Sequence, residues 1–451
     1  MIPKPHQLEG AKFLAERKYA LLADLPRVGK TGSSIMAADY IAAENILVVT
    51  TASGRGVWKA GFPAWSAFPR KIQVLTGSER LRADTNVAIV GWGSLTQNTR
   101  MADLLSRRWD LLIPDEAHNA KNLEAKRTQA LFGNYLPTTD VLAGPRDLFS
   151  RCDRCWLLTG TPLPNSPADA YPMLRTLWPE RLSAQHGPTD VTKQADFIER
   201  YCKMRPMKIG HGWAARTIQV FVEGRNLDEL NARMQGVYLQ RTQKDVGIIE
   251  PEYETMPLIS PKALPAELRD VRHAAEVLAA AQSGDNARLE IHMGPLRRIT
   301  GMLKADLVAD AVKEELDAGL GKIVLAYWHK DVGAALITAL IKYGVTGIDG
   351  STPAKARTAN EQKFLRDPKC RVFLAQIQAA GEAIDLSSAH NLIFVEASFV
   401  PKDMAQMAMR ITNHTQTQQP LVRVATLEGS VDDALQNILL RKWTAIRQVL
   451  K

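Results

Sequence analysis

Cysteine is scarce in this chain of 451 residues, which contains only Cys152, Cys155, Cys202 and Cys370. Four cysteines are too few for a disulfide framework at this length, and the opening residues MIPKPHQLEG contain no apolar signal segment. We therefore expect an intracellular, cytoplasmic protein. Cys152 and Cys155 form a CxxC pair, but a structural zinc site needs two further ligands, and no second CxxC or histidine pair has a suitable spacing. Two ordinary thiols before a buried strand are the favoured alternative.

Long hydrophobic runs, polybasic runs, internal repeats and low-complexity tracts are also missing. The apolar run Ile46 to Thr51 has the length of a strand, so no membrane partner is expected. The composition, 45% hydrophobic and 23% charged, excludes a collagen-like or wholly disordered chain. A net charge of +9, from 57 Lys+Arg and 48 Asp+Glu, favours a polyanionic partner, the alternative being a mildly basic solvated surface.

Short β-branched or leucine-rich runs recur along the chain, each followed by a polar turn or a helical pattern. This pattern is typical of buried parallel strands and predicts an α/β fold. The first series is Tyr19 to Ala23, Ile46 to Thr50, Val87 to Val90, Leu111 to Ile113 and Trp156 to Thr159. The second is Ile323 to Ala326, Gly347 to Ile348, Val372 to Ala375, Leu392 to Val395 and Val422 to Thr426. Two lobes are expected, with functional loops at the carboxyl ends of their strands.

The region between the two series, from about Pro164 to Met302, is predicted to be helical, with Leu227 to Leu239 and Ala263 to Ala281 as its best helices. The expected domains are a first lobe at 1–165, a helical insertion and linker at 166–302, and a second lobe at 303–451.

A candidate phosphate site follows the first strand. Residues Pro26 to Gly29 make a turn and Lys30-Thr31 opens a helix, which is the strand, loop and helix context of a P-loop. Backbone amides at the helix start and the Lys30 ammonium suit phosphates, and the Thr31 hydroxyl suits Mg²⁺. A loop-to-helix junction without nucleotide is the alternative. Arg27 stands where the usual first glycine would be, which removes one position of easy positive φ.

Two adjacent carboxylates, Asp115 and Glu116, end another apolar strand and are followed by Ala117-His118, a DEAH sequence. Asp115 suits Mg²⁺ binding through water, and Glu116 suits orientation and deprotonation of an attacking water. A strand-end cap is the alternative. The turn Thr159 to Pro162 could relay the state of the γ-phosphate, or be an ordinary turn.

In chain order these pieces resemble the Swi/Snf family of helicase superfamily two. The first-lobe motifs are Pro5 to Gly10, Asp24 to Thr31, Val49 to Ser53 with Trp58, Asp115 to His118, and Leu158 to Asn165. The middle has Leu177 to Pro179, Phe197 to Tyr201 and Leu239 to Thr242, and its Asn226-Leu227 with Glu229-Leu230 looks most like the annealing-helicase branch. The second lobe has Gly350 to Thr352, Arg357, Phe364, Ala380 to Glu382, Asp385-Leu386, Pro401, Gln406 and Arg410. The resemblance covers nearly the whole chain.

The resemblance implies two RecA-like P-loop lobes, with ATP and Mg²⁺ as cofactors. It implies catalytic roles for Lys30, Asp115, Glu116 and Arg410, and Mg²⁺ contacts from Thr31 and Asp115. ATP would also contact Gln7, which would read adenine, and Arg27, Gly29, Gly381 and Asp385. Nucleic acid would contact Thr51, Ser53, Lys59, Ser94 and Thr352. DNA, held mainly through its phosphates, is expected, with RNA less favoured.

Two positions depart from the family pattern. The family places two arginines three residues apart in its last motif, but here Arg410 is followed by Asn413, where the arginine finger normally stands. A finger contributes on the order of 10³ to 10⁵ in rate. Either Arg410 does this work alone, His414 or Arg423 helps, or hydrolysis is slow. Ala383 replaces a usual glycine.

The predicted function is that of an ATP-dependent DNA translocase or helicase, which hydrolyses ATP at a cleft between the lobes and moves on DNA, expected to be double-stranded, in replication, recombination or repair. The alternative is a DNA-binding scaffold with weak or vestigial ATPase activity. The small size suggests a bare motor of bacterial or phage origin.

Overall fold

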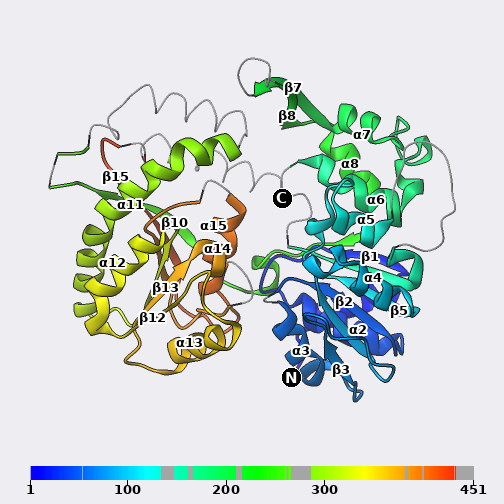
Figure 1. The fold of residues 1–451 in the computed structure, drawn as a ribbon, viewed down its shortest axis with the longest axis horizontal. Helices are drawn as coiled ribbons and strands as arrows, with labels where there is room; N and C mark the ends of the chain where they lie inside the picture. Colours follow the sequence, from blue (N-terminus) through cyan, green and yellow to red (C-terminus); the bar gives the residue numbers. More distant parts are fainter. Residues whose placement is uncertain are drawn as a thin grey trace. The chain divides into compact units, whose positions relative to one another are not determined.

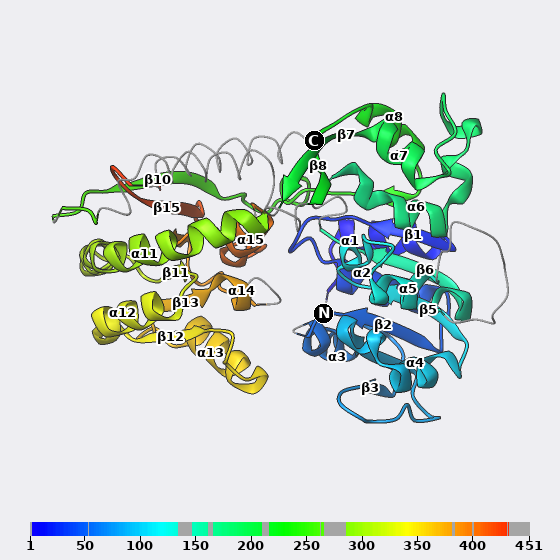
Figure 2. The same cartoon turned by 45° about the horizontal axis from the view of Figure 1, so that its top comes forward.

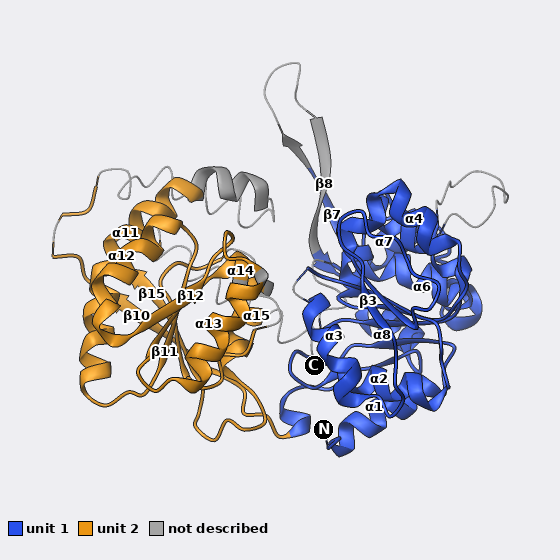
Figure 3. Cartoon of the chain, turned by 60° about the horizontal axis from the view of Figure 1, so that its bottom comes forward, with its two compact units in different colours: residues 1–246 blue, residues 247–451 orange. Residues whose placement is uncertain are grey.

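The computed structural model describes residues 2–52, 54–133, 147–160, 166–209, 216–261, 263–265, 286–380, 384–398, 401–430 and 432, with 207–209, 216–222, 286–293, 354, 380 and 401–402 described by backbone alone. The chain forms two compact units, residues 1–246 and residues 247–451 (Figure 3). Among the described residues, no helix is both long and apolar enough to cross a membrane.

The first unit is built on a seven-stranded sheet in which every described pairing is parallel (Figure 1). Its order is β3 (Ile72–Val74), β4 (Val87–Gly91), β2 (Ile46–Thr50), β5 (Trp109–Pro114), β6 (Cys152–Leu158), β1 (Tyr19–Leu22) and β9 (Tyr238–Leu239). All residues of β2 and β4 are buried, as expected for strands covered on both faces.

Helices cover both faces of this sheet and enclose two apolar clusters. The helices are α1 (Pro5–Ala15), α2 (Lys30–Tyr40), α3 (Gly54–Trp65), α4 (Asn98–Leu105), α5 (Lys126–Phe132), α6 (Tyr171–Leu177), α7 (Gln194–Tyr201) and α8 (Leu227–Met234). One cluster includes Trp58 and Phe62 of α3, and the other includes Phe197 and Tyr201 of α7. The middle of the chain therefore shares a core with the first lobe.

The prediction of a helical middle region is wrong in part. Strands β7 (Cys202–Ile209) and β8 (Arg216–Gly224) pair antiparallel as a sheet of their own. The helix expected over Leu227 to Leu239 ends at Met234, after which Gly236 has a φ of 79° and the chain adds β9 to the first sheet. The helix expected at Ala263 to Ala281 lies largely outside the described residues. The three-domain division stays a prediction.

The second unit contains a six-stranded sheet, again parallel in every described pairing (Figure 2). Its order is β10 (Glu252–Leu258), β15 (Leu421–Leu427), β14 (Asn391–Phe394), β11 (Ile323–Tyr327), β13 (Val372–Gln376) and β12 (Val345–Ile348). The helices are α11 (Asn286–Asp317), α12 (Lys330–Leu340), α13 (Ala354–Arg366), α14 (Ile377–Ala380) and α15 (Pro401–Ala408). The prediction of two α/β lobes with parallel sheets is confirmed.

Candidate nucleotide-binding site

The phosphate loop, residues Asp24 to Thr31, connects β1 to α2. Gly29 has a φ of 107°, and Arg27 has a φ of 74°. Arg27 thus adopts the left-handed conformation that glycine favours, at a cost of about 1–2 kcal/mol. The Lys30 ammonium is folded back into the loop and donates hydrogen bonds to the carbonyl oxygens of Asp24 at 2.6 Å and Leu25 at 3.4 Å.

Residues of α1 pack against this loop. The side chain of Gln7 is buried, and a Cβ placed on Gly29 would lie 2.3 Å from its Nε2 atom. A side chain at position 29 would therefore have to displace Gln7, and it would also be strained by the positive φ. His6 Nε2 lies 2.9 Å from the carbonyl oxygen of Val28. Burial lowers the pKa of His6, although the bond to Val28 opposes the shift. A neutral ring that donates to Val28 accounts for the contact.

The segment after the middle region also holds the loop. Arg241 Nε and Nη2 donate to the two carboxylate oxygens of Asp24 at 3.0 and 2.5 Å. Gln243 Nε2 donates to the carbonyl oxygen of Pro26 at 3.0 Å. The sequence reading gave neither Arg241 nor Gln243 a role. Leu239 to Thr242 was recognised as a family segment, but no local sequence pattern shows that this segment contacts the phosphate loop.

Asp115 follows β5 and is held by three donors. Its Oδ2 atom accepts from Thr50 Oγ1 at 2.8 Å and Trp58 Nε1 at 2.9 Å, while Oδ1 accepts from the amide of Glu116 at 3.0 Å. Trp58 is therefore a hydrogen-bond donor to the predicted Mg²⁺ residue. These donors fix the direction of the carboxylate.

Glu116 and His118 bring this strand end to the next one. Glu116 has a φ of 53°, another left-handed position, and its Oε2 atom lies 3.2 Å from Nδ1 of His118. His118 Nδ1 also lies 2.9 Å from Thr159 Oγ1, after β6. Gly160 adjoins the phosphate loop, since a Cβ there would lie 2.9 Å from Cδ of Pro26. The DEAH sequence, the turn after β6 and the phosphate loop are thus neighbours. Residues 161–165 lie outside the described residues.

The side chains of Asp115 and Thr31 fit a magnesium ion by donor chemistry. Carboxylate and hydroxyl oxygens are the ligands that Mg²⁺ prefers, and Asp115 with Thr31 supplies both. Phosphate oxygens of the nucleotide would supply the further ligands of the ion. Among the described residues no group of three or more His, Cys, Asp or Glu side chains could hold a metal by itself. Cys152 and Cys155 are buried. Burial is the main cause that raises the pKa of the Cys155 thiol, and the neighbouring Cys152 raises it further.

The predicted nucleic-acid residues of the first unit follow β2 and β4, which are adjacent strands. Thr51, half-buried, accepts a hydrogen bond from the Gly54 amide at 3.1 Å. Ser94 is half-buried in a turn after β4, and Lys59 is exposed on α3. Ser53 lies outside the described residues. Trp92 Nε1 donates to the carbonyl oxygen of Asp115 at 2.9 Å, which ties this edge to the candidate site.

In the second unit, Thr352 lies in a turn after β12. Its hydroxyl donates to Asp349 Oδ1 at 2.7 Å. Bonds from Thr352 and Ser351 lower the pKa of Asp349 to about 2. Arg357 of α13 donates to the carbonyl oxygens of Thr352 at 2.9 Å and Ala379 at 2.8 Å. One guanidinium thus fixes both this turn and the end of α14.

Asp385 and Arg410, two predicted site residues of the second unit, lie in segments that are close in the fold. The amide of Asp385 donates to Glu361 Oε1 at 2.8 Å, and the next amide, of Leu386, donates to the carbonyl oxygen of Arg410 at 2.9 Å. The segments of Asp385 and Arg410 are therefore joined by their backbones. Gly381 and Ala383 lie outside the described residues.

Asn413, which stands where the family has its arginine finger, forms local hydrogen bonds. Asn413 Oδ1 accepts from the amide and hydroxyl of Thr415 at 2.7 and 2.8 Å. Arg423 forms a two-bond ion pair with Glu315, with Nη2 to Oε2 at 2.7 Å. Since Arg423 is already engaged, the structure offers no support for it as a substitute finger.

These features define a two-unit α/β protein with a phosphate loop and an acidic strand end on one sheet. Residues 6–256 match the SNF2-related domain, and residues 307–414 match the helicase conserved C-terminal domain. Because the first match covers more than half of the chain, the protein belongs to the SNF2-related family.

Curated relatives align over nearly all of this chain. The human protein named "DNA annealing helicase and endonuclease ZRANB3" is 25% identical, over 97% of this chain and 39% of its own length. "SWI/SNF-related matrix-associated actin-dependent regulator of chromatin subfamily A-like protein 1" of Xenopus tropicalis is 25% identical, over 99% of this chain and 44% of its own length. This chain thus spans less than half of either relative. A solved structure titled "Sulfolobus solfataricus SWI2/SNF2 ATPase core in complex with dsDNA" aligns with 100% of this chain and 93% of that chain, at 19% identity and a TM-score of 0.45.

Proposed function

We propose that this chain is an ATP-driven motor that holds DNA mainly through its phosphates and moves along it. One observation carries the proposal. Lys30 of the phosphate loop and the carboxylates Asp115 and Glu116 lie at the carboxyl edge of one sheet, and the turn Thr159-Gly160 between them adjoins both. This edge is where parallel α/β sheets bind ligands.

The residues at this edge divide the work of phosphoryl transfer to water. The amide groups at the start of α2 attract phosphate oxygens. Lys30 would leave its two neutral carbonyl acceptors for a phosphate, because bonds between opposite charges are stronger. Glu116 would orient and deprotonate the attacking water. Asp115 and Thr31 would hold Mg²⁺, which supplies charge neutralisation on the phosphates.

Arg410 belongs to the second unit, so its role on ATP held by the first unit is part of the proposal. Gln7, Arg27 and Gly29 around the loop, and Gly381 and Asp385 in the second unit, complete the proposed ATP contacts. Thr51, Ser53, Lys59, Ser94 and Thr352 are the proposed DNA contacts.

DNA as the polymer is supported by the net charge of +9 and by the printed names of the relatives. Binding through phosphates should weaken steeply with salt, because bound counterions are released. We favour duplex DNA over RNA, and a role in replication, recombination or repair. Because both relatives cited align over nearly all of this chain and one is named an annealing helicase, reannealing of complementary strands is the first movement to test.

The test is ATP hydrolysis with and without double-stranded DNA, using Glu116→Gln as the blank. Hydrolysis stimulated by DNA and abolished in the blank supports the motor. DNA binding without turnover above the blank would overturn it and support the second candidate, a DNA-binding scaffold with vestigial ATPase parts. Asn413 in place of the usual arginine is the observation that favours that candidate.

A further inference from the structure

Strands β7 and β8 form a two-stranded ribbon that joins neither large sheet. The register pairs Cys202 with Gly224 at one end and Ile209 with Arg216 at the other. Figures 1 and 2 show β7 and β8 beside α7 and α8, apart from the seven-stranded sheet of the first unit. A ribbon of two strands is at best marginally stable in water, so this one needs support from elsewhere.

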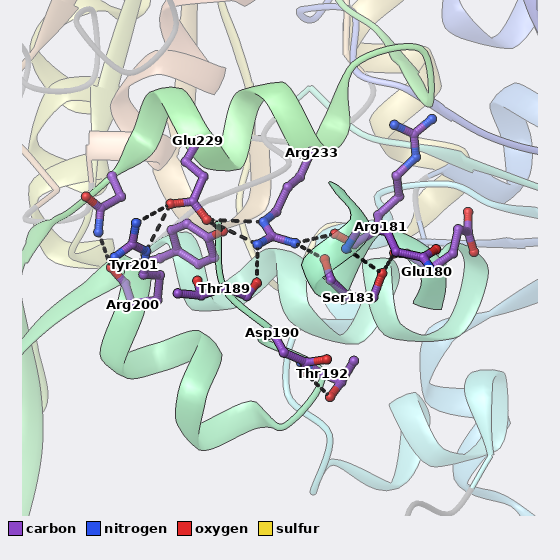
Figure 4. Close-up of polar contacts among 12 residues, drawn as sticks. Glu180, Arg181, Ser183, Thr189, Asp190, Thr192, Arg200, Tyr201, Glu229 and Arg233 are labelled. Atoms are coloured by element: carbon purple, nitrogen blue, oxygen red, sulfur yellow. Dashed lines mark hydrogen bonds and ion pairs between the residues drawn. The ribbon is translucent and has the colours of Figure 1, made fainter. Parts of the chain in front are cut away.

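The support begins with a set of bonds between the two feet of the ribbon (Figure 4). Arg200 directly precedes the Tyr201 residue that leads into β7, and Glu229 lies on α8 just after β8. Arg200 Nε and Nη2 donate to Glu229 Oε2 at 2.9 and 2.6 Å. Tyr201 donates its hydroxyl to Glu229 Oε1 at 2.8 Å, and Asn226 Nδ2 donates to the carbonyl oxygen of Arg200 at 2.9 Å.

Arg233 connects these feet to the rest of the first unit. Its side chain is fully buried and lies 3.2 Å from Glu229 Oε1. It also donates to the carbonyl oxygens of Arg181 at 2.7 Å, Ser183 at 3.0 Å and Thr189 at 2.6 Å. Burial acts to raise the pKa of Glu229, but the bonds from Arg200, Tyr201 and Arg233 outweigh it and lower that pKa. We call Arg200, Tyr201, Asn226, Glu229 and Arg233 the clamp.

The clamp joins Phe197 to Tyr201, a segment that resembles the Swi/Snf family, to Asn226 to Leu230, which looks most like its annealing-helicase branch. The described residues between these segments form the ribbon. The bonds therefore fix the direction in which the ribbon leaves the first unit, because both of its feet meet at the carboxylate of Glu229, which the buried Arg233 holds.

The ribbon carries an excess of positive charge. Between residues 202 and 224 the basic residues are Lys203, Arg205, Lys208 and Arg216, against Glu223 alone. Lys203 pairs with Glu223 at 3.4 Å. The side chain of Arg205 is exposed and forms no ion pair or hydrogen bond with the described part of the chain.

The surface beside the feet has a different charge balance. A cavity of about 390 Å³ there is lined by Asp190, Asp196 and Glu199 as well as Arg200 and Arg225. The positive excess thus belongs to the ribbon itself.

We propose that the β7–β8 ribbon is an arm that contacts the phosphate backbone of duplex DNA, with Arg205 and Lys208 as contact residues and the clamp as its mount. The proposal rests on the proposed function and adds a contact that the family motifs do not supply. A two-stranded ribbon fits the major groove of B-DNA, and cationic side chains at its margins meet phosphates. The positive charge of the ribbon complements the negative charge of the DNA phosphates, and this is why we choose DNA as its partner.

The test compares two double variants that remove the same charge. Arg205→Ala with Lys208→Ala alters the ribbon. Lys342→Ala with Lys369→Ala alters exposed lysines just before β12 and β13, at the amino edge of the second sheet. The dissociation constant for a DNA duplex is measured over a range of salt. If each ribbon residue neutralises one phosphate, the slope of log K against log salt falls by about 1.8 in magnitude in the ribbon variant alone.

ATP hydrolysis without DNA should be unchanged in both variants, and equal unfolding midpoints would show that both are folded. Equal salt slopes in the ribbon variant and the wild type, with DNA bound by both, would overturn the arm. Equal losses in the two double variants would do so as well, because they would show a general charge effect. If the wild type itself binds no DNA, the proposed function fails first and the arm fails with it.

A second measurement tests the contact through the mobility of a label on the ribbon and not through the dissociation constant for DNA. The four native cysteines are buried, so Arg205→Cys provides a single accessible thiol for a fluorophore. The same fluorophore on Lys369→Cys is the control. Duplex DNA should restrict the rotation of the label at position 205 and not at 369. An anisotropy at position 205 that DNA leaves unchanged would contradict the proposal.

Discussion

Arg241 and Asp24 form a buried ion pair with two hydrogen bonds, at 3.0 and 2.5 Å, across 217 positions of the chain. Arg241 is 8% exposed and Asp24 is 0% exposed. The same guanidinium donates to the carbonyl oxygen of His6 and lies 3.2 Å from Glu9. It therefore joins β1, α1 and the segment after the middle region around the phosphate loop.

Removing this guanidinium should loosen the loop. In Arg241→Met, Asp24 is left buried without its partner, so we expect the free energy of unfolding to fall by about 3–5 kcal/mol. The affinity for a fluorescent ATP analogue should fall as well, because the anchored loop is the phosphate site. Urea unfolding and analogue titration are the measurements. Arg82→Met, at an exposed arginine of the same unit, is the control and should change neither quantity. Unaltered analogue affinity in folded Arg241→Met would refute the link.

Trp58 should matter for Mg²⁺ through Asp115. Trp58→Phe removes one of three donors to that carboxylate, a bond to a charged group that contributes about 1.5–3 kcal/mol. We expect a higher Mg²⁺ concentration for half-maximal ATP hydrolysis. Trp109→Phe is matched, since Trp109 is also buried but donates to the carbonyl oxygen of Leu104. It should lower stability without changing the Mg²⁺ dependence, and the same shift in both variants would contradict the role of Trp58.

Arg410 is the arginine of the last motif that we expect to act as the finger. We expect Arg410→Ala to lower kcat by about 10³ to 10⁵ with little change in DNA affinity. Arg423→Ala is the comparison, because Arg423 is held by Glu315 and should affect stability more than turnover. Single-turnover hydrolysis with bound DNA measures the rate of the chemical step in both variants. Similar kcat values for Arg410→Ala and the wild type would show that this chain uses no finger at Arg410.

The turn at Asp349 should lose stability in acid. Its pKa is lowered from the ordinary 3.8 to about 2 by bonds from Thr352 and Ser351, so the folded state favours the charged form. That contribution is present above pH 4 and is lost as the pH falls from about 4 to 2. Asp349→Asn should therefore melt below the wild type at pH 6, and the gap should close toward pH 2. Exposed Asp306→Asn is the control, and a gap independent of pH would contradict the assignment.

The clamp should stabilise the ribbon from its base. Glu229→Gln keeps the size of the side chain but removes the charge that faces Arg200 and Arg233, so both guanidinium groups lose their carboxylate partner. We expect the substitution to accelerate amide hydrogen exchange in β7 and β8 more than in β2 or β5. Exchange measured by mass spectrometry tests this. Uniform acceleration throughout the first unit would show instead that Glu229 supports the whole core.

The sequence by itself determined the two lobes, because a parallel strand buried on both faces is a continuous apolar run that can be read locally. All ten expected strands are present, with ends that differ by a few residues at most. The phosphate loop and the acidic strand end were recognisable for the same reason, since each is a short motif at a strand terminus. Even the departure at Arg27 is local, and the chain accepts the left-handed φ there without glycine.

The tertiary structure alone decided which distant residues support these motifs. Arg241 meets Asp24, Trp58 meets Asp115, and Glu229 meets Arg200 only after the chain has folded. The β7–β8 ribbon was missed because its charged and apolar residues do not alternate cleanly, and its strands belong to neither large sheet. Periodicity reports how one segment meets a core, whereas an ion pair between remote segments has no period. Its partners become known only when packing brings them together.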